Sequence, residues 1–289
     1  EVRQRNSQDW WFGVWQPDEV NGVPFADLDP QVLQHGDAWV LKPSASWHGF
    51  GDLGSDYCML DPIKVTVLTP GQTLEGRMES SGIPAPLVSS FLASRGIVVE
   101  KTEPYSILLL FSLGVTKGKW GSLVAGLMEF KKYYDSNASL ELVMPDLVAS
   151  YGERYAGMGI KDLAEVMHKD MLSSKLLQNM DAAFTVLPDQ VASPRDTFAR
   201  LVKGDIEQIP VRDMQDRTVA VQVVPYPPGI PLMMPGEKAG ADKRAIIDYL
   251  LAMEVFDNRF PGFGHHNHGV ENQQDAAGNL TYMVYVVKQ

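Results

Sequence analysis

The sequence is poor in the features that mark disulfide-stabilised, membrane-spanning and nucleic-acid-binding proteins. Its single cysteine, Cys58, cannot form an intramolecular disulfide, which fits a reducing compartment such as the cytoplasm. No apolar run reaches the roughly 18 residues that a spanning helix needs, so no membrane partner is expected. The net charge is −11 and both halves of the chain carry more acidic than basic side chains, which excludes the positive field that nucleic-acid binding requires.

Internal repeats and low-complexity tracts are also missing, and 289 residues are too many for one ordinary core. We therefore expect two domains, 1–140 and 141–289, with the boundary near 137–145 where the sequence pattern changes. The chain opens with EVRQRNSQDWW, without an initiator methionine or a targeting segment. This start predicts a piece of a longer polypeptide.

The first domain begins with an aromatic, irregular stretch and continues with clearly patterned elements. Five of the six tryptophans lie in the first 50 residues, which predicts short strands and loops that face a partner or a missing part of the chain. Further on, the patterns predict strands at 63–69, 97–100 and 106–113 and helices at 82–96 and 117–135. The order β-α-β-β-α indicates an α+β fold with an antiparallel sheet and helices on one side.

The second domain mixes helical and strand patterns. Helices are predicted at 145–155, 159–177 and 242–258, and a further helix at 194–203 begins after Ser193, a typical N-cap residue. Strands are predicted at 218–224 and 280–287. This domain is therefore also expected to be α+β.

Two motifs that suggest ligands are set aside. GVTKGKWGS (114–122) has the wrong spacing for a phosphate-binding loop and carries Trp120 where a hydroxyl must reach magnesium. HHNH (265–268) holds three imidazoles, but its neighbours lack a second ligand pair, so a solvated loop is favoured and no metal site is predicted. For His48 in SWHGF, a hydrogen-bonded structural histidine in an aromatic shell is favoured.

Two other segments keep two interpretations each. PYPPGIPLMMPGE (225–237) is either a rigid segment that holds nearby atoms in place or a structural crossover between two sheets. Glu100 ends an apolar run, where an ionised carboxylate needs a cation or several donors. It either pairs with Lys101 or Arg95, or awaits the cation of a ligand.

The chain resembles the C-terminal part of the bacterial ornithine/lysine/arginine decarboxylases, which depend on pyridoxal phosphate and have the aspartate-aminotransferase fold (fold type I). The segments that carry the resemblance follow one another in order and are WQPDEV (15–20), SWHGF (46–50), LDPIKVTVLTPG (60–71), GIPAPLV (82–88), GIVVEKTEPYSILLLFSLGVTKGK (96–119), PYPPGIPLMMPGE (225–237) and FPGFGHHNHG (260–269). The resemblance implies that 1–140 is the small subdomain of the decarboxylase core and 141–289 the family's C-terminal domain.

The resemblance also implies that the pyridoxal-phosphate-binding large domain is absent from this chain. Family members bind the cofactor through a lysine in a Ser-x-His-Lys segment, and the only His-Lys here is His168-Lys169, in a helical pattern. No catalytic residue and no cofactor are therefore expected in this chain, which alone should be inactive. The implied partners are the missing N-terminal part, a basic amino acid as substrate, and further copies forming a dimer and a larger ring such as a decamer.

Substrate specificity is the last implication of the resemblance. In the lysine- and ornithine-type members the strand carries VEKT, as at 99–102 here, with its glutamate near the distal ammonium of the substrate. This assigns Glu100, and after it Thr102, to substrate binding and favours conversion of L-lysine to cadaverine and CO₂. Pro228, Gly229 and Pro231 are assigned to the active-site rim.

Two alternatives to a lysine decarboxylase stay open. GKWGSLV (118–124) and the stretch 144–163 resemble the arginine branch more closely, so an arginine or ornithine decarboxylase is one of them. The other is a non-catalytic assembly or regulatory module with the same C-terminal fold.

Overall fold

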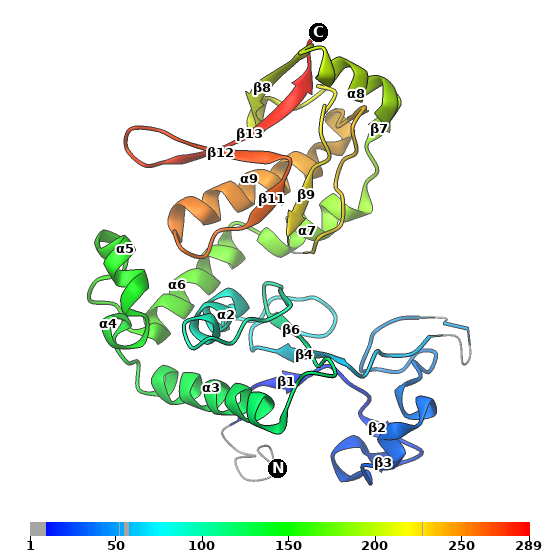
Figure 1. The fold of residues 1–289 in the computed structure, drawn as a ribbon, viewed down its shortest axis with the longest axis vertical. Coiled ribbons are helices and arrows are strands. Elements are labelled where there is room, and N and C mark those ends of the chain that lie inside the picture. The colour runs from blue at the N-terminus through cyan, green and yellow to red at the C-terminus, as the bar shows by residue number, and fades with distance from the viewer. Residues whose placement is uncertain (1–9, 52, 55–57, 227) are drawn as a thin grey trace. The chain divides into compact units, whose positions relative to one another are not determined.

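The computed structural model describes residues 10–51, 53–54, 58–226 and 228–289 (Figure 1). Internal contacts divide the chain into two compact units, and both mix helices with antiparallel strands. Unit 1 comprises Glu1–Ser139 and Gly159–His168, and unit 2 comprises Leu140–Met158 and Lys169–Gln289. Helix α6 (Ile160–Ser173) begins in the first unit and ends in the second.

A four-stranded antiparallel sheet forms the centre of unit 1. In spatial order its strands are β1 (Gly13–Val14), β4 (Lys64–Leu68), β6 (Ser106–Leu110) and β5 (Lys101–Thr102). β4 pairs along its whole length with β6, from Lys64 opposite Leu110 to Leu68 opposite Ser106. The strands predicted at 63–69 and 106–113 are thus confirmed, although the second ends at Leu110.

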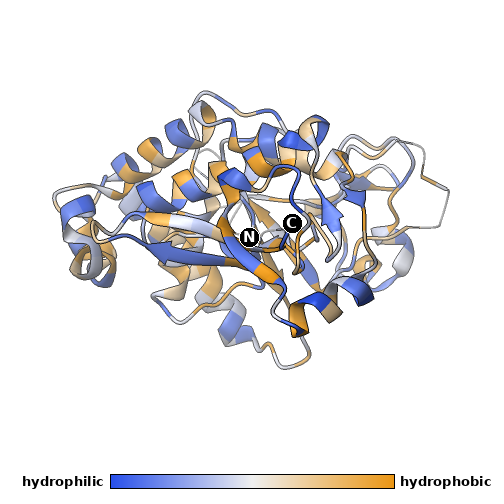
Figure 2. Ribbon diagram, turned by 90° about the horizontal axis from the view of Figure 1, so that it is seen from above, coloured by the Kyte–Doolittle hydropathy of each residue, from blue (hydrophilic) through white to orange (hydrophobic). Residues whose placement is uncertain are grey.

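Two helices supply the other half of the core of unit 1. α2 (Ala85–Ala93) and α3 (Lys117–Asp135) confirm the helices predicted from the sequence, and α2 packs against α3, β5 and β6. Phe91 of α2 and Phe130 of α3 are fully buried and meet edge to face, with ring centroids 5.2 Å apart. Figure 2 shows helices banded in orange and blue, as expected where one face of a helix is apolar.

The segment before β4 has little regular structure, as predicted. It holds a short hairpin and three single turns of 3₁₀ helix, which are β2 (Glu19–Val20), β3 (Val23–Pro24), η1 (Phe25–Asp27), η2 (Val32–Gln34) and η3 (Gly36–Trp39). Aromatic contacts hold these pieces together, for example Trp15 against Trp47 with centroids 5.2 Å apart.

A hydrogen-bond relay through His168 ties α6 to Tyr105, the residue before β6. The hydroxyl of Tyr105 lies 2.7 Å from Nδ1 of His168, and Nε2 of His168 lies 3.1 Å from the carbonyl oxygen of Glu79. Because a carbonyl only accepts, Nε2–H is the donor there and the tyrosine hydroxyl donates to Nδ1. The close approach needs Gly82, where a Cβ would lie 2.5 Å from Nδ1 of His168. His168 is therefore a structural residue whose two ring nitrogens are both hydrogen-bonded.

Unit 2 is built around helix α9 (Arg244–Arg259) and the three-stranded antiparallel sheet β12-β13-β8. Strand β13 (Leu280–Val287) pairs on one side with β12 (Val270–Gln274) and on the other with β8 (Ile206–Pro210). Two-stranded sheets β10-β7 and β11-β9 complete the unit. The remaining elements are α4 (Leu140–Val143), α5 (Pro145–Tyr155), α7 (Leu176–Thr185), β7 (Asp189–Gln190), α8 (Pro194–Val202), η4 (Val211–Asp213), β9 (Val224–Tyr226), β10 (Glu237–Lys238), η5 (Ala241–Lys243) and β11 (His266–His268).

Several sequence predictions for the second half of the chain are confirmed. The helices predicted at 145–155, 194–203 and 242–258 correspond to α5, α8 and α9, and the strand at 280–287 is β13. Ser193 caps α8 as expected, because its hydroxyl accepts a hydrogen bond from the backbone N–H of Asp196 at 3.1 Å.

The strand predicted at 97–100 is wrong. Gly96 has φ +74° and the N–H of Ile97 bonds to the carbonyl oxygen of Leu92 at 3.0 Å, so these residues still close the end of α2. Val98 follows with 86% of its surface exposed, and pairing with β6 begins only at the N–H of Glu100. The apolar run IVV is therefore the exit from a helix and not a strand.

Two further elements differ from prediction. The stretch 218–224 is not one strand, because Thr218, Val219 and Val223 make isolated bridges to three different partners before β9 begins. The helix predicted at 159–177 is two helices: α6 ends at Ser173, and α7 starts after Lys175, which has φ +55°. Neither glycine nor proline marks that break in the sequence.

Candidate functional site

Glu100 lies immediately before β5, and its backbone is fixed while its side chain is exposed. Its N–H donates to the carbonyl oxygen of Leu108 at 2.9 Å, which anchors the residue to β6. Within the described part of the chain, its carboxylate makes no ion pair or side-chain hydrogen bond. The backbone of Glu100 is thus anchored at the sheet edge, and its solvated carboxylate is free to meet a cation.

Both protein cations that the sequence offered to Glu100 are bound elsewhere. Arg95 grips Glu129 with Nε 2.7 Å from Oε2 and Nη2 3.3 Å from Oε1, and its guanidinium lies over the ring of Phe91. Lys101 forms its ion pair with Glu103. The structural pairing considered for Glu100 is therefore absent from the described residues, and the carboxylate stays available.

Thr102 has a less open position than Glu100. It lies on β5, is half-buried, and its hydroxyl donates to the hydroxyl of Ser89 on α2 at 2.9 Å. This bond ties β5 to α2. Thr102 therefore supports the strand that carries Glu100, and its hydroxyl proton is already committed.

The proline-rich segment links two sheets of unit 2. It leaves β9, which pairs with β11, turns at Gly229, and reaches β10, which pairs with β7. Gly229 has φ +80°, and a Cβ there would lie 2.8 Å from the ring of Tyr226. The crossover interpretation is confirmed by this pairing; Pro228 is half-buried, Pro231 is exposed, and Pro227 lies outside the described residues.

The expected solvated loop at HHNH is wrong, because His266–His268 form β11, paired with β9. His266 and His268 are exposed on one side of the strand, with ring centroids 4.7 Å apart. His265 is turned inward, with Nδ1 2.6 Å from Oδ1 of Asp257. Among the described residues, no group of three or more histidine, cysteine, aspartate or glutamate side chains is placed to hold a metal ion.

The interpretation of His48 as a structural histidine is confirmed. It is 7% exposed, and its ring stacks on Phe50 and meets Trp47 edge to face. Its Nδ1 accepts from the N–H of Phe50 at 3.0 Å, so Nε2–H donates to the carbonyl oxygen of Lys42 at 2.9 Å. The ring therefore joins two turns of the irregular segment.

One polar network was missed by the sequence reasoning. Asp257 on α9 is 3% exposed at its side chain and accepts from the backbone N–H of His265, from the His265 ring and from the hydroxyl of Tyr282. Burial raises the pKa of Tyr282, and the nearby charge of Asp257 raises it further. Only the aspartate inside an otherwise apolar helical face signals this network in the sequence.

Comparisons with known proteins agree over nearly the whole chain. Residues 1–119 match the family model described as Orn/Lys/Arg decarboxylase, major domain, and residues 177–288 match the one described as Orn/Lys/Arg decarboxylase, C-terminal domain. The chain is 46% identical over 289 residues to the lysine decarboxylase LdcA of Pseudomonas aeruginosa. It is 39% identical over 269 residues to the biodegradative arginine decarboxylase of Escherichia coli.

These matches cover the chain almost completely but only part of each relative. The chain is covered at 100% and 91%, whereas it spans 37% and 36% of the two relatives. The solved structure of lysine decarboxylase A from Pseudomonas aeruginosa superposes with a TM-score of 0.88 at 45% identity, covering 99% of this chain and 37% of that one. In the described part of the chain, no helix combines the length and the apolar character that crossing a membrane requires.

Proposed function

Because the chain belongs to the Orn/Lys/Arg decarboxylase family, we propose that it forms part of a lysine decarboxylase, which converts L-lysine to cadaverine and CO₂. Glu100 carries this proposal. Its carboxylate is exposed and has no protein cation among the described residues, at the position where a substrate ammonium would be recognised. The relatives of the chain include proteins named as lysine decarboxylases, which supports the assignment.

The role proposed for Glu100 is to hold the distal ammonium of the substrate. A hydrogen bond between an ammonium and a carboxylate is charge-assisted and stronger than a neutral one. Pairing of the Glu100 backbone with β6 and the bond from Thr102 to α2 fix the strand from which this carboxylate extends. In this proposal a shorter diamino acid would reach a carboxylate on this strand less well, so the place of Glu100 on the strand can select by substrate length.

Pyridoxal phosphate, the cofactor implied by the family, does not fit the residues of this chain. No Ser-x-His-Lys segment occurs, and in the single His-Lys pair His168 is locked between Tyr105 and Glu79. In the proposal, the cofactor is bound by a part of the protein outside this chain and supplies the electron sink for decarboxylation. The chain by itself is then inactive and binds no pyridoxal phosphate specifically.

The rest of the proposed biology follows from family membership. The complete protein would be cytoplasmic and would assemble as a dimer and then as a larger ring. Pro228, Gly229 and Pro231 would lie at the rim of its active site, where their rigid backbone costs little entropy on binding.

An arginine decarboxylase is the second candidate, since the chain is 39% identical to the biodegradative arginine decarboxylase. In that case Glu100 would not contact the substrate. Release of agmatine in preference to cadaverine by the complete protein would establish this alternative.

The experiment is a comparison of two glutamate variants in the complete gene product. Glu100→Gln removes the exposed carboxylate, whereas Glu103→Gln removes the nearby carboxylate that is already paired with Lys101. We expect kcat/KM for lysine to fall roughly 30-fold in the first variant, or ~2 kcal/mol, and to change little in the second. Unchanged lysine turnover in Glu100→Gln would remove Glu100 from the substrate site.

A further inference from the structure

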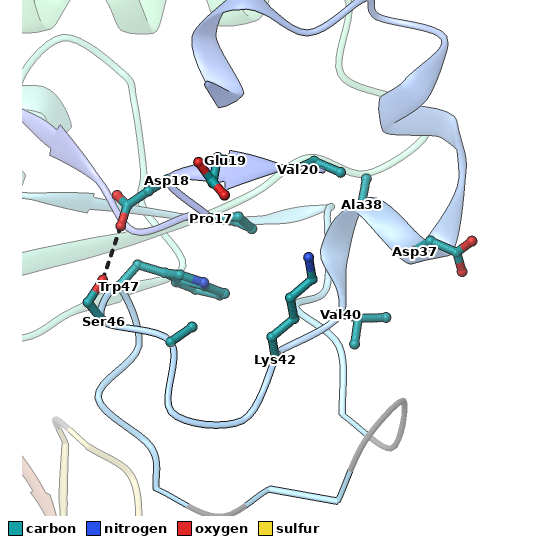
Figure 3. A pocket seen from close by; sticks show the side chains of 11 residues that line it. Pro17, Asp18, Glu19, Val20, Asp37, Ala38, Val40, Lys42, Ser46 and Trp47 are labelled. Atoms are coloured by element: carbon teal, nitrogen blue, oxygen red, sulfur yellow. Dashed lines mark hydrogen bonds between the residues drawn. The ribbon is translucent and has the colours of Figure 1, made fainter. Parts of the chain in front are cut away.

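A cavity of about 380 Å³ opens in the irregular first segment of unit 1, away from Glu100, which does not line it (Figure 3). Its volume is within the range of small-molecule sites. Two segments that stand out in the sequence meet there: WQPDEV contributes Pro17 to Val20, and SWHGF contributes Ser46 and Trp47. Neither segment has a part in the proposed recognition of lysine.

Two nitrogen donors reach this cavity without an acceptor among the described residues. Trp47 is only 6% exposed, yet its indole Nε1–H has no hydrogen-bond partner among the described residues. Lys42 extends between the walls, and its ammonium makes no ion pair within the described part of the chain (Figure 3). Neither nitrogen is a buried atom left without a hydrogen bond: Lys42 is an exposed residue and Trp47 Nε1 is open to solvent, so both donors are accessible to an acceptor on a ligand.

His48 contacts both residues that carry these donors. Its Nε2–H bonds to the carbonyl oxygen of Lys42, and its ring packs against Trp47 with centroids 4.8 Å apart. The backbone of Lys42 and the ring of Trp47 are therefore fixed relative to each other. Such pre-organisation lowers the entropy that a ligand must overcome on binding.

A carboxylate without a cation lines the same cavity. Glu19 is the first residue of β2 and is exposed, and its side chain has no ion pair among the residues that the structure describes. Asp18 is engaged weakly by the hydroxyl of Ser46 at 3.5 Å, and Asp37 points away from the other side chains (Figure 3). Lys42 and Glu19 thus line one cavity with opposite charges and do not pair with each other.

We propose that this cavity binds a small aliphatic α-amino acid in its zwitterionic form. The ligand carboxylate accepts from Nζ of Lys42 and Nε1 of Trp47, and its ammonium donates to the carboxylate of Glu19. Its side chain lies against the apolar walls made by Pro17, Val20, Ala38 and Val40. A simple anion would leave Glu19 unpaired, and a simple amine would leave both donors open.

The test is a calorimetric titration of the 289-residue chain with three matched probes. L-norleucine carries both charged groups, hexanoate lacks the ammonium, and pentylamine lacks the carboxylate. We expect norleucine to bind with the highest affinity of the three. Lys42→Met should weaken norleucine and hexanoate roughly tenfold, and Glu19→Gln should weaken norleucine but not hexanoate.

The controls separate this site from the surface charge and from the decarboxylase proposal. Lys64→Met removes another exposed lysine of unit 1, and Glu100→Gln removes the carboxylate proposed to meet the substrate. Neither variant should alter norleucine binding, whatever the outcome of the turnover experiment. Norleucine affinity equal to that of pentylamine, equal losses in Lys42→Met and Lys64→Met, or no saturable binding of norleucine would each overturn the proposal.

Discussion

The carboxylate of Asp257 in unit 2 is 3% exposed and receives hydrogen bonds from His265 and Tyr282, whereas the carboxylate of Glu100 in unit 1 is exposed and receives none from the described residues. Removing a charge from water is costly unless donors replace the lost hydration, so Asp257 had to be surrounded for unit 2 to fold. Glu100 keeps its water and needs no protein partner. The buried, hydrogen-bonded carboxylate of Asp257 is therefore structural. The solvated carboxylate of Glu100, next to an ordered strand, is available for a ligand.

The largest expected change in the free energy of unfolding comes from replacing Asp257, the hydrogen-bonded carboxylate. Asp257→Asn replaces an acceptor of several hydrogen bonds by an amide, whose NH₂ group must face the hydroxyl of Tyr282 or the ring of His265. We expect the free energy of unfolding to fall by about 3 kcal/mol. The measurement is urea denaturation followed by circular dichroism.

The matched control for this loss is Glu100→Gln. Because the Glu100 side chain is solvated, we expect its replacement to change the free energy of unfolding by less than about 0.5 kcal/mol. Equal destabilisation by the two variants would contradict the division between a structural and an available carboxylate.

The sequence predicts more of the fold than of the site, and the reason lies in the range of the interactions. Helix α3 and strand β13 are predicted with their observed bounds, because apolar spacing and end residues are local signals. Helix α6 and the stretch 218–224 are not, since Lys175 adopts φ +55° and Thr218, Val219 and Val223 find three separate partners. Tertiary pairing decided those positions.

The candidate site shows the same limit. The resemblance drew attention to Glu100, but only the structure shows that Arg95 belongs to Glu129 and Lys101 to Glu103. Likewise, SWHGF predicts a buried aromatic histidine, whereas the cavity beside Trp47 and Lys42 depends on a hairpin some 25 residues away in the sequence. Assignments of partners between distant residues cannot be made from local pattern alone.

A smaller effect is expected from the relay that holds α6 in unit 1. Tyr105→Phe removes the hydroxyl that donates to Nδ1 of His168, which leaves a buried acceptor without this donor. We expect a loss of about 1–2 kcal/mol in the free energy of unfolding. Tyr226→Phe, at an exposed tyrosine, is the matched control and should have almost no effect in the same denaturation assay. A Tyr105→Phe chain as stable as the parent would show that the relay contributes nothing.

The smallest expected change in stability tests whether the ion pair with Glu129 holds Arg95 and so keeps it from pairing with Glu100. Hydrogen bonding from the Arg95 guanidinium, opposed by burial, lowers the pKa of Glu129 below its ordinary value of 4.5. A lowered pKa in the folded state means that the pair stabilises the fold above pH 4.5, and that this contribution is lost as the pH falls through the lower folded value.

Since Glu129 is 41% exposed, solvent screens the pair, and we expect Glu129→Gln to lower the free energy of unfolding by only about 0.5 kcal/mol at pH 7. The difference between parent and variant should shrink as the pH falls below 4.5 and also in high salt, as measured by urea midpoints. A difference that stays constant as the pH falls from 7 to well below 4.5 would mean that Arg95 is held by its stacking on Phe91 and not by the carboxylate of Glu129.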